Sequence, residues 1–403
     1  MKFIRNFAVT NESFRTLRRT AHNIRHSAMK RDLSFAGTGI SHVIISALAL
    51  GSVLLSCSKD RGPSEGGLTG GESTFNVTLN AGSFAGTPIG GGELDEAEGL
   101  SKVIPATGMH EDDMANIWVL QFNTGGSCVR STYYPAYNPD NFPVTLSNGT
   151  AQTVAFVANT FDANLFKDYA GTWSAFQSLT KNVTEATVHT GSGAADRYLI
   201  ISGIYKGDIT TTGIQTAVQM KRAVAKIRFT WSLELPAGET FASKSMQICK
   251  AATKQAYMEQ SAALYPAGAA GNFAAYEDLD IPDEGTYTWY VAENVRGTGT
   301  GSTSFDKTEL TAPNGQGQYC TYIDLQGEYT FANGQTVDLS YKFYLGANVT
   351  TDYNVRRNNI YDMTVRITGA NAADTRITIT SADGTWGVDT DNPNNVNGGA
   401  TFN

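Results

Sequence analysis

Histidine and cysteine, the side chains that most often serve in catalysis and metal binding, are scarce in this chain. Its 403 residues include five His and four Cys. Three of the histidines, His22, His26 and His42, fall within the first 56 residues. The cysteines lie far apart and never form a C-x-x-C pair, so the sequence supports neither a zinc site nor a disulfide framework.

The other two histidines carry no catalytic motif. His110 and His189 stand among polar, loop-like residues, and neither is accompanied by the spacing of a nucleophile elbow. The Gly-rich stretch 297–301 is not followed by Lys and Ser or Thr, as a phosphate-binding loop requires. We therefore expect no enzyme activity, no cofactor and no metal site.

Besides Cys57, the chain has three isolated cysteines, Cys128, Cys249 and Cys320. Isolated thiols of this kind are usually small core residues. One bridge between two of them, formed in an oxidising compartment, is the alternative.

An excess of basic residues is also missing. Residues 1–56 contain eight Lys and Arg against two Asp and Glu, so without them the net charge changes from −8 to −14. We therefore expect no nucleic-acid partner. The remainder is poor in charge and rich in Gly, Thr, Tyr and Phe, which is typical of an exported β-protein with many turns.

The most informative segment of the sequence is Leu54-Leu55-Ser56-Cys57. It closes an apolar run, 40–55, that is too short and too often interrupted by polar residues to span a membrane. A small residue and Cys after such a run resemble the lipobox of bacterial lipoproteins. The resemblance implies export, acylation of Cys57 and anchoring in outer-membrane lipid. The alternative is that Cys57 is a buried core thiol.

Residues 1–56 are thus interpreted as a leader with a lipoprotein signal peptide. Translation from Met29 would give a signal peptide of ordinary length, and a real but extended basic segment is the alternative. Residues 57–72 are polar and rich in Gly, Ser and Pro, which predicts a flexible tether. Within them, Ser58-Lys59-Asp60 resembles the short signal that sends lipoproteins of Bacteroidota to the cell surface.

From Ser73 onward the apolar residues follow the period of a β-strand. Phe75, Val77 and Leu79 alternate with polar residues, as a half-buried strand requires. Further apolar segments, such as Ile117–Phe122, alternate with turn signals.

One segment departs from the β pattern. Residues 164–180 place several apolar side chains on one helical face, which predicts a short helix. The whole pattern predicts an all-β fold with two β-sandwich domains in tandem, over 73–220 and 221–403.

In the basic stretch that starts at Lys221, Arg222, Lys226 and Arg228 are expected to face water, while the core is expected to take up Ala223, Ala225, Ile227 and Phe229. Arg357-Asn358 is expected to organise a turn.

Five short motifs follow one another along residues 73–370. They are Gln121-Phe122-Asn123, Ala155-Phe156-Val157-Ala158-Asn159, Lys221 to Ile227, Tyr290 to Gly297, and Phe343 to Gly346 leading on to Asp352–Tyr361. In this order, downstream of a lipobox, they resemble the fimbrillin-like subunits of Bacteroidales type V pili.

This resemblance implies two transthyretin-like β-sandwich domains and a role as a structural subunit of a cell-surface pilus. It also implies that a trypsin-like surface protease removes an N-terminal strand, and that a strand from a neighbouring pilus subunit fills the opened groove. The strand to be removed would be the one containing Phe75, Val77 and Leu79. Between Arg61 and Arg130 the only Lys or Arg is Lys102, so we expect cleavage between Lys102 and Val103.

The donated strand is expected in the C-terminal segment 374–403. Ile377 and Ile379 alternate with Thr, Trp386 follows a Gly turn, and the rest has too little apolar surface to fold alone. The alternative is that Arg376–Thr380 is the final strand of the second sandwich. A surface adhesin or glycan-binding lipoprotein on the same sandwiches is the alternative function.

Overall fold

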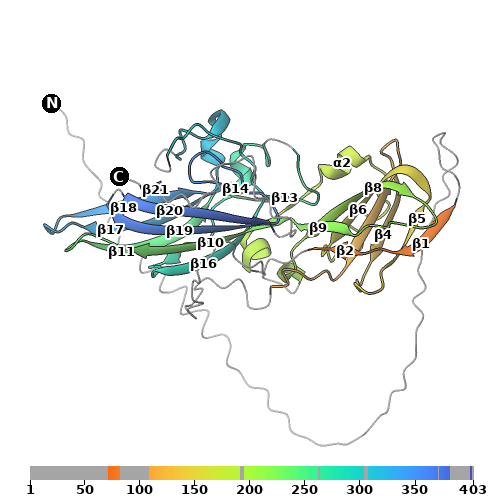
Figure 1. The fold of residues 1–403 in the computed structure, drawn as a ribbon, viewed down its shortest axis with the longest axis horizontal. Coiled ribbons are helices and arrows are strands. Elements are labelled where there is room, and N and C mark those ends of the chain that lie inside the picture. Colours follow the sequence, from red (N-terminus) through yellow and green to blue (C-terminus); the bar gives the residue numbers. More distant parts are fainter. Residues whose placement is uncertain are drawn as a thin grey trace, which may run out of the picture. The chain divides into compact units, whose positions relative to one another are not determined.

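The structure is a computed structural model that describes residues 71–81, 109–190, 195–261, 264–303, 307–370, 372–381 and 400–401. All of these residues lie in one compact unit. Strands make up most of its regular structure (Figure 1).

The first part of the chain is built on a six-stranded sheet with the order β2-β9-β8-β6-β3-β4. Its pairs are antiparallel except for β2 with β9, which is parallel. A separate two-stranded antiparallel sheet is formed by β1 and β5. The bounds are β1 Glu72–Asn76, β2 Leu79–Asn80, β3 Ile117–Phe122, β4 Cys128–Tyr134, β5 Pro143–Ser147, β6 Gly149–Ala158, β8 Ile201–Ile209 and β9 Val218–Arg222.

The six-stranded sheet carries apolar side chains on both faces, and each face is covered by other segments of the chain. In β3 every residue is buried, and alternation sends Ile117 and Val119 into one cluster and Trp118, Leu120 and Phe122 into the other. The first cluster also contains Val144 and Leu146 of β5 and is called the first-face core. The second takes in side chains from the segment around α2 (Trp173–Gln177) and is called the second-face core.

Helix α2 is much shorter than the predicted helix over 164–180. It begins after Thr172, whose hydroxyl accepts a hydrogen bond from the Ala175 N–H at 3.2 Å. The preceding turns break the helix, since Asp168 has a φ of +55°. Phe176 is its buried residue and packs into the second-face core.

The second part is a sandwich of two sheets. The five-stranded sheet has the order β16-β10-β19-β20-β21 and the four-stranded sheet the order β15-β11-β17-β18. Their inner faces enclose one large core, to which Ile227, Phe229, Ile248 and Leu325 belong. The bounds are β10 Val224–Leu233, β11 Thr240–Cys249, β15 Leu279–Asp280, β16 Gly285–Ala292, β17 Tyr322–Thr330, β18 Thr336–Tyr344, β19 Asn359–Gly369, β20 Ala372–Ser381 and β21 Ala400–Thr401.

Short elements complete the described structure. Two more antiparallel pairs are β7 with β13 and β12 with β14. Their bounds are β7 Thr180–Asn182, β12 Ala251–Ala252, β13 Lys254–Ala256 and β14 Phe273–Ala274, and the irregular helices are η1 Ala186–Thr190, η2 Ala195–Arg197, η3 Ala270–Asn272, η4 Pro313–Gly315 and η5 Gly317–Tyr319.

The predicted all-β fold is confirmed, including the short helix in its first part. The chain passes from the six-stranded sheet to the second sandwich at Ala223, which lies between β9 and β10. In the part of the chain that the structure describes, no helix is both long and apolar enough to cross a membrane.

Candidate functional site

The N-terminal segment 72–81 contributes two short strands to two different sheets. Among the described strands, β1 pairs with β5 alone, with Phe75 opposite Val144. Side chains add to this pairing: the Ser73 hydroxyl donates to Asn148 Oδ1 at 2.9 Å, and the hydroxyls of Thr74 and Thr145 lie 2.8 Å apart. Glu72 also forms an ion pair with Arg130.

The segment changes sheets at Val77 and Thr78. The Val77 N–H donates to the Phe142 carbonyl at 3.0 Å, on the side of the small sheet. One residue further on, the Thr78 carbonyl accepts a hydrogen bond from the Val218 N–H at 2.9 Å, where the pairing of β2 with β9 begins. Because β2 is the last strand of the six-stranded sheet, the segment lies at a sheet edge in both places.

The apolar side chains of this segment complete the first-face core. Val77, Leu79 and Ala81 are buried, with exposed fractions of 2%, 7% and 8%. Phe75 packs against the same core, and its ring covers Gly213, where an added Cβ would lie 2.3 Å from the ring. Burying a side chain such as Val or Leu stabilises a fold by about 1.5–3 kcal/mol, so this core depends on the segment.

Of the predicted site residues, the structure brings Phe75, Val77 and Leu79 together at the first-face core. Cys57, the predicted cleavage site Lys102–Val103, and Trp386 lie outside the described residues.

A buried arginine joins the end of this segment to the rest of the molecule. The Arg222 side chain is 0% exposed. Its Nη1 donates to the Ala81 carbonyl at 2.8 Å and to Asn358 Oδ1 at 3.0 Å. Its Nε donates to the Glu111 carbonyl at 2.7 Å, and its Nη2 to the Asp112 carboxylate. The expectation that Arg222 faces water is therefore wrong.

The side chains of two residues that follow 82–108, His110 and Glu111, contact the two parts of the protein, one part each. The His110 ring stacks on Tyr198 of the first part, with ring centres 4.1 Å apart. The Glu111 carboxylate accepts from Lys226 Nζ at 2.9 Å and from the Tyr290 hydroxyl, both in the second part. Residues 81 and 111 thus meet at Arg222, one on each side of 82–108.

Three of the five motifs that suggested a pilus subunit, those in 221–227, 290–297 and 352–361, contact one another through buried polar groups. Arg357 Nε donates to the Glu293 carboxylate at 3.1 Å, and the two side chains are 1% and 2% exposed. Asn354 Oδ1 accepts from the N–H groups of Arg296 and Gly297 at 3.0 and 2.7 Å.

Asn358, the Asn of the predicted Arg-Asn turn, has a φ of +60°. Its side chain accepts from the Arg222 backbone and guanidinium, at 3.1 and 3.0 Å. Sequence reasoning missed this use of the turn, because the pattern of polar residues alone does not reveal the partner.

The C-terminal segment pairs with the chain's own second sandwich. Strand β20 lies antiparallel to β19, with Ile377 opposite Met363 and Ile379 opposite Tyr361. Strand β21 then pairs with β20. The backbone thus holds the predicted donor residues Ile377 and Ile379 at strand positions.

Several other candidates carry no binding chemistry. Tyr134 and Tyr137 both pack on the Phe142 ring, at 5.0 and 5.1 Å, and Tyr133 packs on Trp118 at 5.2 Å. All three rings thus pack on aromatic residues of their own part of the chain. Among the described residues no group of His, Cys, Asp and Glu could hold a metal ion.

The three described cysteines are free thiols. Burial raises the pKa of Cys128 to about 11 and that of Cys320 to about 12, so both stay protonated and unreactive at neutral pH.

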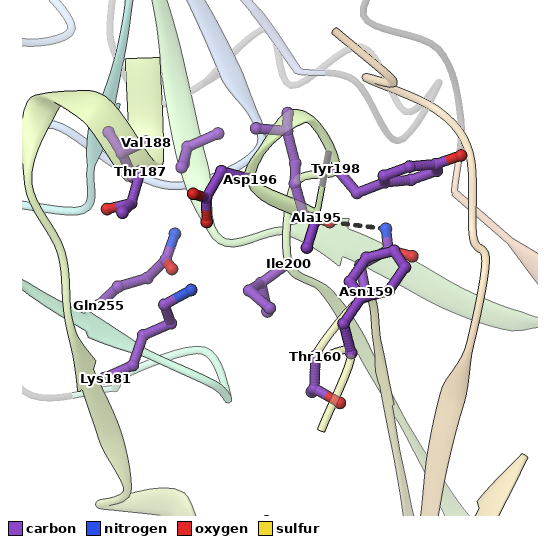
Figure 2. Close-up of a pocket in the computed structure, with 13 residues that line it drawn as sticks. Asn159, Thr160, Lys181, Thr187, Val188, Ala195, Asp196, Tyr198, Ile200 and Gln255 are labelled. Atoms are coloured by element: carbon purple, nitrogen blue, oxygen red, sulfur yellow. Dashed lines mark hydrogen bonds between the residues drawn. The ribbon is translucent and has the colours of Figure 1, made fainter. Parts of the chain in front are cut away.

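A small polar cavity lies beside η2. Figure 2 shows Lys181, Asp196 and Gln255 pointing toward its centre, with the Asn159 amide donating to the Leu199 carbonyl at 2.7 Å nearby. Its volume of about 40 Å³ has room for a few waters but not for an organic substrate.

The sequence of this chain matches one protein-family model. A family model described as "Domain of unknown function (DUF4906)" matches residues 289–365, the stretch that contains Glu293, Asn354 and Arg357. Among curated protein sequences, none matches this chain.

Solved structures that the chain is similar to include fimbrial proteins. The C-terminally truncated tip fimbrial protein Mfa3 from Porphyromonas gingivalis is 14% identical, over 77% of this chain and 100% of its own, with a TM-score of 0.49. A fimbrilin from the same species is 13% identical, over 74% and 90%, with a TM-score of 0.40. A fimbrial assembly protein from Parabacteroides distasonis is 14% identical, over 77% and 99%, with a TM-score of 0.39. These names agree with the resemblance that the sequence motifs indicate.

Proposed function

We propose that this protein is a structural subunit of a cell-surface pilus, exported as a lipoprotein acylated at Cys57. In this proposal a trypsin-like protease cuts after Lys102, the segment with Phe75, Val77 and Leu79 leaves, and a strand from a neighbouring subunit takes its place. The protein is then a building element and not an enzyme.

The observation that carries the proposal is the placement of segment 72–81. Both of its strands have a single partner, β5 or β9, so its departure breaks no pairing between the other strands of the first part. Its buried side chains Val77 and Leu79, however, belong to the first-face core. Removal would therefore leave a folded domain with an apolar groove and two unpaired strand edges, which is the receptor that strand addition needs.

The donated strand is proposed to come from residues 374–403 of the neighbouring subunit, with Ile377, Ile379 and Trp386 entering the groove. Since β20 pairs with β19 of its own chain, donation of Ile377 and Ile379 requires β20 to leave this position. Donation by Trp386 and the residues around it would leave β20 in place. The alternative that Arg376–Thr380 is the permanent last strand stays open.

The proposal is tested by assembly of the mature protein in the presence of a trypsin-like protease. We expect fibres in negative stain whose subunits begin at Val103. The variant Lys102→Gln should remain monomeric, whereas Lys206→Gln, which removes an exposed lysine of the same part, should assemble normally. A chain truncated after Gly369 should not extend fibres. Ordinary fibres from Lys102→Gln would contradict the cleavage site, and ordinary fibres from the truncated chain would contradict the donor strand.

Lipidation is tested separately in cells. The variant Cys57→Ala should accumulate as unprocessed precursor, and mass spectrometry of the native protein should find an acylated Cys57 at its N-terminus before assembly. An unacylated N-terminus upstream of Cys57 would contradict this part of the proposal.

A further inference from the structure

Arg222 is placed to act on whichever strand fills the first-face groove. Its guanidinium is fully buried, and one of its hydrogen bonds goes to a backbone carbonyl of the present occupant, Ala81. Ala81 lies two residues beyond Leu79, the last large apolar side chain of that occupant in the core. The contact therefore depends on the position of the strand and not on a side chain.

The other contacts of Arg222 hold its guanidinium in this place. Nη1 also donates to Asn358 Oδ1 at 3.0 Å, Nε to the Glu111 carbonyl at 2.7 Å, and Nη2 to the Asp112 carboxylate. None of these acceptors belongs to the N-terminal segment. When segment 72–81 leaves, the guanidinium keeps these anchors while one N–H of Nη1 loses its acceptor.

We propose that Arg222 is the positioning residue that sets the register of the strand in this groove, by requiring a carbonyl at the place of the Ala81 carbonyl. This inference rests on the proposed function, since it concerns the strand that replaces segment 72–81. A buried charged donor that loses its acceptor is costly. A replacing strand is therefore disfavoured in any register that leaves Nη1 without a carbonyl.

Because Arg222 contacts a backbone carbonyl, it constrains how the strand is aligned in the groove and not which side chains the strand carries. In a strand the carbonyls point alternately to opposite sides, so a shift by one residue turns the carbonyl away from Arg222 and also turns the apolar side chains out of the core. Arg222 and the pockets of Val77 and Leu79 thus select the same register independently.

The experiment uses competition in the mature chain after cleavage at a specific protease site introduced within 82–108. A fluorescent peptide of residues 71–81 fills the groove, and two unlabelled peptides compete for it. One is residues 71–81 with a C-terminal amide. The other is residues 71–80 ending in an N-ethylamide, which keeps the nitrogen, Cα and Cβ of Ala81 and lacks the terminal carboxamide that contains its carbonyl.

We expect the peptide with the carbonyl to bind about 10- to 100-fold more tightly, the range for a hydrogen bond from a charged donor. In the variants Arg222→Met and Arg222→Lys, the ratio of the two peptides' dissociation constants should be smaller than in the wild type. In the methionine variant we expect it to be about twofold. A purely structural role of Arg222 would change the binding of both peptides equally and leave the ratio as it is.

Equal binding of the two peptides to the wild-type protein would overturn the inference, even if both Arg222 variants failed to fold. An unchanged ratio in a folded variant would overturn it as well. If neither peptide displaces the bound segment, strand replacement itself is contradicted, and the proposed function fails with the inference.

Discussion

At the scale of single residues, His189 couples folding to pH. Its ring is buried, and Nδ1 accepts a hydrogen bond from the Tyr290 N–H at 3.3 Å. Burial lowers the pKa of His189 to about 4. Since the folded pKa lies below the ordinary value of about 6.5, the unfolded chain takes up the proton first, and stability falls as the pH drops from about 6.5 to 4.

We predict that the wild-type protein loses about 2 kcal/mol more of its free energy of unfolding than His189→Gln does between pH 7.5 and pH 5. Urea unfolding at the two pH values measures this, and the comparison with the variant removes the contribution of the carboxylates. Equal losses in the two proteins would show that His189 is not buried in its neutral form.

The buried pair Glu293–Arg357 is a second residue-scale case. Both side chains are almost completely buried, so removal of one charge leaves the other without compensation. We predict that Arg357→Met lowers the free energy of unfolding by about 3–5 kcal/mol. The double variant Arg357→Met, Glu293→Gln should lose clearly less than the sum of the two single variants, and strict additivity in urea unfolding would contradict the coupling.

At the scale of elements, Gly213 controls how strand β1 lies on the core. Gly213 and Gly126 have almost the same backbone angle, with φ of +74° and +75°. An added Cβ would meet the Phe75 ring at Gly213 but nothing within 4 Å at Gly126. The pair separates the cost of the backbone angle from the loss of the ring contact.

We predict that Gly126→Ala costs about 1 kcal/mol of stability, from the backbone angle alone. Gly213→Ala should cost more and should also expose segment 72–81, because Phe75 must move away. Limited proteolysis of the two variants checks this. Equally slow cleavage within the segment in both would show that the Phe75 ring does not hold it.

The elements also show how far the sequence predicts this fold. The alternation of Phe75, Val77 and Leu79 predicted correctly that the three side chains face one core: Val77 and Leu79 are buried in it and the partly buried Phe75 packs against it. The break between β1 and β2 was not predictable, since it arises where Val77 bonds to Phe142 and Thr78 to Val218, more than 60 residues further along the chain for the nearer partner.

The buried contacts of Arg222 could not be predicted either, because they too join residues that are far apart in the sequence. In the sequence, Arg222 belongs to a stretch in which basic residues recur among apolar ones, a pattern typical of a solvated strand face. Its burial follows from acceptors at Ala81, Glu111 and Asn358, which come from three distant places in the sequence. Composition and period say nothing about such a meeting point, although the Arg357-Asn358 motif marked one of its components.

At the scale of the whole molecule, Tyr257 links the second sandwich to the first part. It follows β13, its N–H donates to the Leu179 carbonyl at 3.2 Å, and its ring packs edge-on against Phe166 at 5.2 Å within the second-face core. Arg357 in turn bonds to the carbonyl of Ala256 at 2.9 Å. The buried ion pair therefore supports one of the residues that join the two parts.

We predict that Tyr257→Ser lowers stability by a few kcal/mol and separates the unfolding of the two parts into two transitions. Trp118 reports on the first part, and Trp231 and Trp289 report on the second. Tyr205→Ser, which alters a partly buried tyrosine within the first part alone, should lower stability without splitting the transition. A single transition in Tyr257→Ser would contradict the coupling.

The meeting of Ala81 and Glu111 at Arg222 has a consequence for the kinetics of release. As long as residues 82–108 are intact, segment 72–81 is tethered to its own groove at an effective concentration of about a millimolar. It rebinds after every opening, so even modest affinity keeps it in place. In the proposed function, hydrolysis of one peptide bond within 82–108 turns this binding into an encounter between two molecules, and dilution then favours departure of the segment.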